Sequence, residues 1–168
     1  MLGLNSKKLR LIRLNEEHFK LLFQDFRKLE KRMDAFPSKQ EPTNEYLEAM
    51  EVSLNEGIRD FENFQWYAPW QIIDKKENQI IGSIGFKGSP NEKGEVEIGY
   101  GINEEFQGLG LATEAVSVLS RWAFRQGTVN TIFAETKKND LASTRVLEKN
   151  NFKHVGKKEN SIYWQLNR

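Results

Sequence analysis

Residues 106–114 read FQGLGLATE and carry the residue types that could bind an anion. Gly108 and Gly110 stand two apart, directly before an apolar stretch with helical spacing. Glycines let the backbone turn sharply and let a ligand come close. The first turn of a helix leaves N–H groups unpaired and carries partial positive charge. The spacing therefore predicts a phosphate-type site made of the backbone amides from Gly108 to Thr113, with Gln107 at its rim.

Two common phosphate-binding motifs fit this stretch poorly. A P-loop requires G-x-x-x-x-G-K-[ST], and the chain has no such run. A dinucleotide turn requires G-x-G-x-x-G inside a strand–helix–strand unit, and Gly108, Gly110 and Thr113 meet only part of it. Glu135 ends the next expected strand, where the acid of such a unit would stand. A nucleotide-binding protein therefore stays open as an alternative.

The elements around this turn follow from hydrophobic periodicity. Apolar residues recur every third or fourth position in four segments, which predicts helices at about 15–32, 44–59, 112–126 and 140–150. Alternating or β-rich runs predict strands at 9–14, 68–74, 79–86, 95–102 and 129–136, and a closing pair in FKHVGKK and NSIYWQLN. Hairpin-linked middle strands are antiparallel, whereas the two strands that flank helix 112–126 could lie parallel. We expect a single α+β (mixed α/β) domain over residues 1–168, its central mixed and mostly antiparallel sheet flanked by about four helices.

Composition excludes several classes of function. The chain has 168 residues and a net charge of +1, without the basic excess typical of nucleic-acid binding. It has no cysteine, so disulfides, thiolate metal sites and cysteine nucleophiles are excluded. His18 and His154 lie in separate elements, and no metal site is expected. No apolar run has the length of a signal peptide or membrane span, so we expect a soluble, cytoplasmic protein that binds no membrane. Its oligomeric state, monomer or homodimer, stays open.

The flanks of the glycine turn resemble a known family. EVEIGYGINEEFQGLGLATEA resembles motif A of the GNAT acetyltransferases, whose Q/R-x-x-G-x-G/A consensus is met by Gln107, Gly110 and Ala112. AETKKNDLASTRVLEKNNF is similar to the strand and helix that follow in that superfamily, and the likeness extends over essentially the whole chain. The closest subgroup contains ribosomal-protein N-terminal acetyltransferases. The resemblance implies a GNAT-like fold and an acyltransferase that moves the acetyl group of acetyl-CoA to a primary amine by direct attack.

The resemblance also implies which residues bind acetyl-CoA. The strand before the turn would contact the pantetheine arm and acetyl carbonyl through Tyr100, Gly101 and Ile102. A glycine inside a strand suggests a bulge or close backbone approach, which at Gly101 would expose an N–H as an oxyanion donor; plain sheet pairing is the alternative. The turn would contribute Gln107, Gly108, Leu109, Gly110, Leu111, Ala112 and Thr113. The family's asparagine before the later helix falls at Asp140, with Asn139 one position earlier, and which of the two contacts the cofactor stays open.

Two residues are the candidate catalytic groups under this resemblance. Glu97 matches the acid of the family's E-I-G-Y segment and would accept the amine proton, directly or through water; a solvated strand carboxylate is the alternative. Leu147 stands where many members have a tyrosine that protonates the leaving thiolate. Ser143 matches a serine of the favoured subgroup and would hydrogen-bond to the sulfur, unless it is a surface serine. Asn151 replaces a family glycine, but asparagine tolerates positive φ, so this turn can form.

The acceptor is the least determined part of the function. A protein or peptide N-terminus, a small-molecule amine such as an antibiotic or polyamine, and a lysine all fit, and the subgroup likeness favours the first. Trp66, Tyr67 and Trp70 either border the acceptor site or pack in the core. A non-catalytic acyl-CoA-binding module is an alternative from another class, since Leu147 and Asp140 depart from the family pattern.

Overall fold

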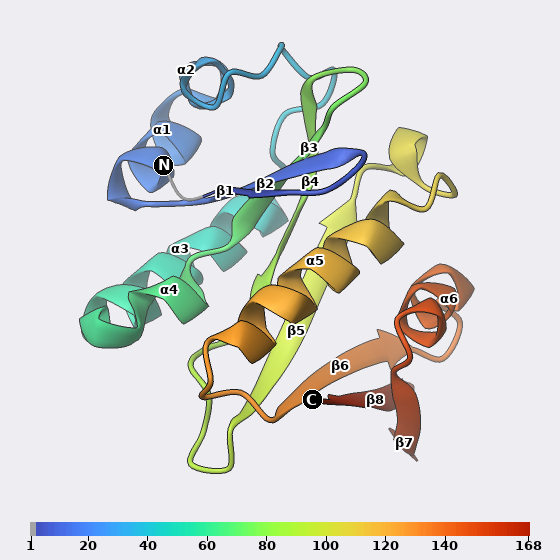
Figure 1. The fold of residues 1–168 in the computed structure, drawn as a ribbon. Coiled ribbons are helices and arrows are strands. Elements are labelled where there is room, and N and C mark those ends of the chain that lie inside the picture. The colour runs from blue at the N-terminus through green and yellow to red at the C-terminus, as the bar shows by residue number, and fades with distance from the viewer. Residues whose placement is uncertain (1–2) are drawn as a thin grey trace.

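A computed structural model describes residues 3–168 of the chain. Its centre is an eight-stranded sheet with the strand order β1-β2-β3-β4-β5-β6-β8-β7 (Figure 1). The strands are β1 (Gly3–Asn5), β2 (Leu9–Arg13), β3 (Trp70–Asp74), β4 (Gln79–Phe86), β5 (Glu95–Ile102), β6 (Thr131–Lys137), β7 (Lys153–Lys158) and β8 (Ser161–Asn167). The helices are α1 (Glu16–Gln24), α2 (Phe26–Arg32), α3 (Asn44–Arg59), α4 (Phe64–Tyr67), α5 (Leu111–Arg125) and α6 (Leu141–Lys149), with 3-10 turns at Phe61–Asn63 and Glu104–Phe106.

The sheet is mixed and mostly antiparallel, as predicted. The β5–β6 pair is parallel, and the other neighbouring pairs are antiparallel. The parallel pairing is short, because it joins Glu95–Glu97 to Thr131–Phe133 and stops there. Beyond Glu97, β5 stays paired with β4 while β6 turns away beside β8 (Figure 1). The sheet therefore opens along the last five residues of β5.

Helices cover both faces of the sheet. Helix α5 lies across one face, where its side chains pack with residues of β2, β4 and β5, and α6 adds Leu147 to the same core. Helices α1, α2 and α3 pack on the other face around Phe19, Leu29 and Ile73. The even-numbered residues of β5 face α5, because Val96 and Ile98 belong to that core. The odd-numbered residues of β5 face the opposite side.

The helix count corrects the sequence-based expectation of about four. The segment predicted as one helix over 15–32 is two helices, α1 and α2, joined at Asp25. Asp25 has an extended backbone, and its side chain accepts a hydrogen bond from the Lys28 N–H at 3.1 Å, so it caps α2. The apolar periodicity runs through this break and hides it. Strand β1 and the one-turn helix α4 were also missed, because both are too short to show a period.

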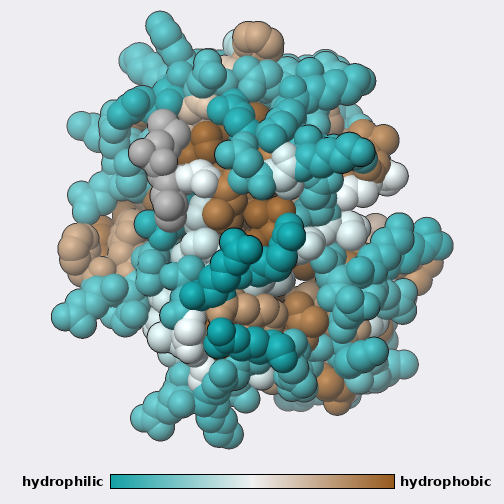
Figure 2. Space-filling model, in the orientation of Figure 1, coloured by the Kyte–Doolittle hydropathy of each residue, from teal (hydrophilic) through white to brown (hydrophobic). Residues whose placement is uncertain are grey.

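Three helix ends carry residue types that favour those positions. Asn15 caps α1 in a capping box with His18. Gly127 follows α5 with φ of +79°, and Asn151 follows α6 with φ of +63°. Within residues 3–168 no helix is both long and apolar enough to cross a bilayer. On the face drawn in Figure 2 hydrophilic side chains predominate, and apolar ones show in patches between them.

Candidate active site

The glycine turn leaves a row of backbone amides unpaired. Gly108 and Gly110 have φ of +75° and +77°, a region that residues with a Cβ rarely adopt. Gly110 is the N-cap of α5, and no side chain caps this helix end. Among residues 3–168, no backbone group accepts a hydrogen bond from the N–H groups of residues 108–113. These donors converge at the positive end of a helix of 15 residues, which suits a phosphate.

Lys8 holds this turn in place, a role that the sequence did not indicate. Its Nζ donates to the Leu109 carbonyl at 3.2 Å, and its backbone N–H donates to Glu114 Oε1 at 2.7 Å. Burial alone would raise the pKa of Glu114, but its hydrogen bonds with Ser6 and Lys8 and the charges of Lys8 and Lys7 lower that pKa overall. Glu114 therefore stays ionised and ties the start of α5 to the start of β2.

A pocket of about 420 Å³ opens in front of the free amides. It lies between the end of β5, the glycine turn and the start of α6, and we call it the turn pocket. It brings together most of the residues predicted to bind the cofactor: Tyr100, Gly101, Ile102, Gln107, Gly108, Gly110, Leu111, Ala112, Thr113, Asp140 and also Ser143. Leu109 and Asn139 do not line it, so of the two residues before α6 the pocket contains Asp140.

Asp140 and Ser143 are bonded to each other at the start of α6. Asp140 is the N-cap, and its carboxylate accepts from the Ser143 N–H at 2.9 Å and from the Ser143 hydroxyl at 2.7 Å. The Ser143 proton is therefore engaged by a carboxylate rather than free to meet a ligand. Leu147, in the position of the family's tyrosine, is fully buried and cannot reach the pocket.

Tyr100 supplies the phenolic hydroxyl of the turn pocket. It projects from β5 on the face of α5, and its hydroxyl donates to the Ser143 carbonyl at 3.3 Å. Burial raises the pKa of Tyr100 to about 12. The hydrogen bond with Ser143 lowers this pKa and the charge of Asp140 raises it, and burial is the largest of the three contributions. The phenol is thus protonated at neutral pH, and its one protein bond is long and made to a neutral acceptor. Compared with the Ser143 hydroxyl, which is bonded to a carboxylate, the Tyr100 hydroxyl is more readily available to a ligand.

Hydrogen bonds at the two ends of the β4–β5 ladder show which residues of β5 direct their backbone groups toward β4. The Lys87 N–H donates to the Glu97 carbonyl at 2.9 Å, and the Asn103 N–H donates to the Ile81 carbonyl at 2.8 Å. Bonded and non-bonded pairs alternate along an antiparallel ladder. The odd-numbered residues of β5 therefore direct their N–H and C=O groups toward β4.

This alternation corrects the expectation that Gly101 exposes its N–H. Gly101 pairs in register with Ser83, so its backbone groups bond to β4. Tyr100 and Ile102 instead direct their backbone groups into the space that β6 leaves open. Gln107 Nε2 already donates to the Ile102 carbonyl at 3.0 Å, which agrees with that direction. The N–H groups of Tyr100 and Ile102 are therefore directed to where a ligand in this space could accept a hydrogen bond from them.

Glu97 does not lie in the turn pocket. It projects to the other face of β5 and forms an ion pair with Lys87, where both side chains are partly exposed. It lines a shallow hollow with Phe133 and Tyr163, close to the point where β5 and β6 separate. A direct contact with groups in the turn pocket is therefore not available to this carboxylate.

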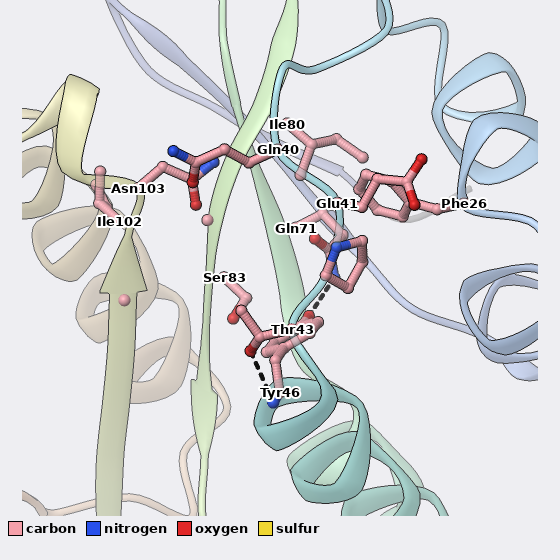
Figure 3. Close-up of a pocket in the computed structure, with 13 residues that line it drawn as sticks. Phe26, Gln40, Glu41, Thr43, Tyr46, Gln71, Ile80, Ser83, Ile102 and Asn103 are labelled. Atoms are coloured by element: carbon pink, nitrogen blue, oxygen red, sulfur yellow. Dashed lines mark hydrogen bonds between the residues drawn. The ribbon is translucent and has the colours of Figure 1, made fainter.

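A second pocket, of about 260 Å³, lies on the opposite face of the same strand end (Figure 3). We call it the opposite pocket. Its walls come from α2, the loop before α3, α3 itself and strands β3 to β5, with Phe26, Thr43 and Tyr46 on the helical side. Gly101 and Ile102 line both pockets. No sequence motif indicated this pocket, because its residues are spread from Phe26 to Asn103.

Two cations of the turn pocket were also missed. Arg145 and Lys149 stand four residues apart on α6, and both line the pocket with exposed side chains. Their i, i+4 spacing is the signal that could have found them. Trp66 and Trp70 are buried against Trp122 of α5, so they pack in the core and do not border either pocket.

An uncapped helix start with unpaired amides lies beside two separating strands, an arrangement that suits a phosphate-bearing ligand. The chain belongs to the GNAT family of acetyltransferases, because residues 8–153 match the family model described as an acetyltransferase (GNAT) domain. Acetyl-CoA is the donor that enzymes of this family use. This membership agrees with the resemblance of the glycine turn and its flanks to motif A of the GNAT acetyltransferases.

Curated relatives and solved structures agree with this membership. The chain is 33% identical over 116 residues to the uncharacterized N-acetyltransferase YjdG of Bacillus subtilis (strain 168), and the match spans 66% of each protein. It is 32% identical over 87 residues to the uncharacterized N-acetyltransferase p20 of Bacillus licheniformis, spanning 52% of this chain and 49% of that one. The chain thus spans about two-thirds of the length of YjdG and about half of the length of p20.

Two solved structures share the fold over nearly their whole length. The ribosomal-protein-S5-alanine acetyltransferase of Vibrio fischeri has a TM-score of 0.70 at 16% identity, covering 99% of this chain and 97% of that one. A ribosomal L7/L12 alpha-N-protein acetyltransferase in complex with coenzyme A has a TM-score of 0.71 at 17% identity, covering 99% and 98%.

Proposed function

We propose that this protein transfers the acetyl group of acetyl-CoA to a primary amine, and that the amine is the N-terminus of a protein or peptide. The observation that carries the proposal is that two pockets on opposite faces of the sheet share Gly101 and Ile102. One pocket has the donors for a phosphate-bearing ligand. The other offers a second molecule access to the same strand end. Two substrates could therefore meet there without a covalent enzyme intermediate.

The turn pocket suits the donor. The free amides of residues 108–113 would hold its pyrophosphate at the start of α5. Arg145 and Lys149 supply positive charge at the α6 side of the same pocket. Gly101 and Ile102 at the strand end would lie beside the thioester.

The transfer needs three changes at the thioester. The neutral amine attacks the carbonyl carbon, so that a C–N bond forms and the C–S bond breaks. The N–H groups of Tyr100 and Ile102 would stabilise the negative charge that develops on the carbonyl oxygen. The amine proton passes to water or to a base in solution, and the thiolate takes a proton. We assign that second proton to the Tyr100 phenol, the most acidic hydroxyl among the residues that line the turn pocket, which water then reprotonates.

The opposite pocket supports a peptide amine over a polycationic one. Glu41 is the charged residue among its lining residues, and its side chain is 68% exposed and 3.5 Å from Arg27. A polyamine or an amino-sugar antibiotic carries several cations and would need several carboxylates. The ribosomal-protein acetyltransferases that share the fold act, by their names, on protein amines.

Release of free thiol from acetyl-CoA tests the proposal. The purified protein would be assayed with a neutral tripeptide amide, spermidine and an aminoglycoside as acceptors. We expect thiol release that depends on the peptide and clearly exceeds release with the other two amines. Tight coenzyme A binding with no release for any amine would instead identify a non-catalytic binding module. Protection against thermal unfolding by NAD or ATP, and not by coenzyme A, would refute the donor assignment.

A further inference from the structure

Gln71 is a buried amide with an apolar residue on each side of it along its strand. It lies in β3 between Trp70 and Ile72, and it is 2% exposed. Because side chains alternate along a strand, Gln71 points away from the α5 core and into the opposite pocket, which it lines (Figure 3). A buried amide costs roughly 1–3 kcal/mol unless its groups are hydrogen-bonded. Its presence here therefore requires a reason.

One half of this amide is bonded within the protein. Gln71 Nε2 donates to the Tyr46 hydroxyl at 2.7 Å, and burial raises the pKa of Tyr46, so this partner stays neutral. The bond fixes the orientation of the Gln71 side chain. The Gln71 carbonyl makes no hydrogen bond with another group of residues 3–168, and it is not sealed from the pocket. It is an oriented, neutral acceptor with no protein partner.

The sheet register places the Gln71 carbonyl in line with the strand end where the two pockets meet. Gln71 pairs with Ser83, and Ser83 pairs with Gly101. The three residues form one cross-strand row on one face of the sheet. Adjacent strands are about 4.8 Å apart, so Gln71 and Gly101 are about 10 Å apart at the backbone. The Gln71 side chain, together with one residue of a bound acceptor peptide, spans that distance.

We infer that Gln71, oriented by Tyr46, binds the first peptide N–H of the acceptor and so selects amines that carry a neutral amide beside them. The inference rests on the proposed acetyl transfer at Gly101. The pocket lining contains no lysine, arginine or histidine, so the carboxylate of a free amino acid would find no cation there and would face the Gln71 carbonyl. A lysine side chain has no amide near its amine. The substrate class is thus a peptide N-terminus.

A double-mutant cycle tests this contact. One partner of the cycle is Gln71→Met, which keeps the side-chain length and removes the carbonyl. The other is a trialanine amide whose first peptide bond is replaced by an ester, which removes the N–H and keeps the shape. In the wild-type protein the ester should raise the acceptor KM about tenfold. In Gln71→Met the two acceptors should have equal and raised KM values, while KM for acetyl-CoA stays unchanged.

The controls separate this contact from a structural role. Gln165→Met, on β8 outside both pockets, should leave the tenfold discrimination intact. Tyr46→Phe removes the group that orients Gln71 and should also reduce the discrimination, which provides the test if Gln71→Met does not fold. Equal discrimination by the wild type and both variants would overturn the inference. Absence of transfer by the wild type to any amine would refute the proposed function itself.

Discussion

The carbonyl oxygen of Gly101 lies 2.1 Å from the point where a Cβ on Gly82 would stand. This close approach lies across the β4–β5 ladder at the strand end that both pockets share. A methyl group at residue 82 would therefore push Gly101 out of position. Gly82→Ala should lower the free energy of unfolding by about 1–3 kcal/mol and should sharply reduce acetyl transfer.

Gly99→Ala is the matched control for that variant. A Cβ at residue 99 would meet only the Lys87 Cε, at 3.9 Å, which is an ordinary contact. Its stability should change by less than about 1 kcal/mol. Urea unfolding of both variants measures the difference, and equal midpoints would show that the Gly82–Gly101 approach does not constrain the site.

Gly110→Ala should separate ligand binding from backbone strain. Gly110 and Gly127 have nearly the same φ, +77° and +79°, and neither has an atom within 4 Å of an added Cβ. An alanine at either position should cost about 1–2 kcal/mol of stability. Only Gly110 lines the turn pocket, so only Gly110→Ala should weaken coenzyme A binding, by about tenfold or more in calorimetry. Equal affinities of the two variants would argue against the amide cradle.

Tyr100→Phe should lower kcat while leaving folding nearly intact. General acid catalysis contributes about 10²–10⁴-fold, and removal of the phenol should cost at least the lower part of that range. Tyr163→Phe, outside both pockets, should retain wild-type turnover. With the pKa of Tyr100 at about 12, its loss of a proton should cause no fall in wild-type rate below about pH 10. A fall in the wild-type rate below that pH that is absent from Tyr100→Phe would contradict the assigned protonation state.

Glu97→Gln should have a small effect on turnover, within about threefold. The Glu97–Lys87 ion pair is partly exposed, and such pairs contribute about 0–1 kcal/mol to stability. The carboxylate lines neither of the two pockets that meet at Gly101. Steady-state rates of the variant and of Lys87→Met provide the measurement. A loss of a hundredfold in Glu97→Gln alone would restore Glu97 as the proton acceptor, acting through water.

Features that depend only on residues close together along the chain could be predicted from the sequence. The bounds of β4 and β5, residues 79–86 and 95–102, were correct because turn residues flank each run. The unpaired amides of residues 108–113 follow from two glycines placed before a helix. Strand parity, which is also a local property, separates Glu97 from the face that Val96 and Ile98 share.

Features that depend on sheet order could not be predicted. Which face of β5 carries the turn pocket depends on where α5 packs, so parity alone did not show that Glu97 lies outside it. Gln71 sits in an apolar run, and its role appears only when Ser83 and Gly101 line up beside it. Asp25 is an ordinary capping residue, but the apolar period continues across it.

The most direct test uses a peptide that carries two amines, a neutral N-terminal residue and one internal lysine. The peptide would be incubated with acetyl-CoA and the purified protein, and the site of modification read by tandem mass spectrometry. We expect one acetyl group on the N-terminal nitrogen, with one free thiol released for each acetyl transferred. An unmodified peptide, or an acetyl group on the lysine side chain, would contradict the proposed function.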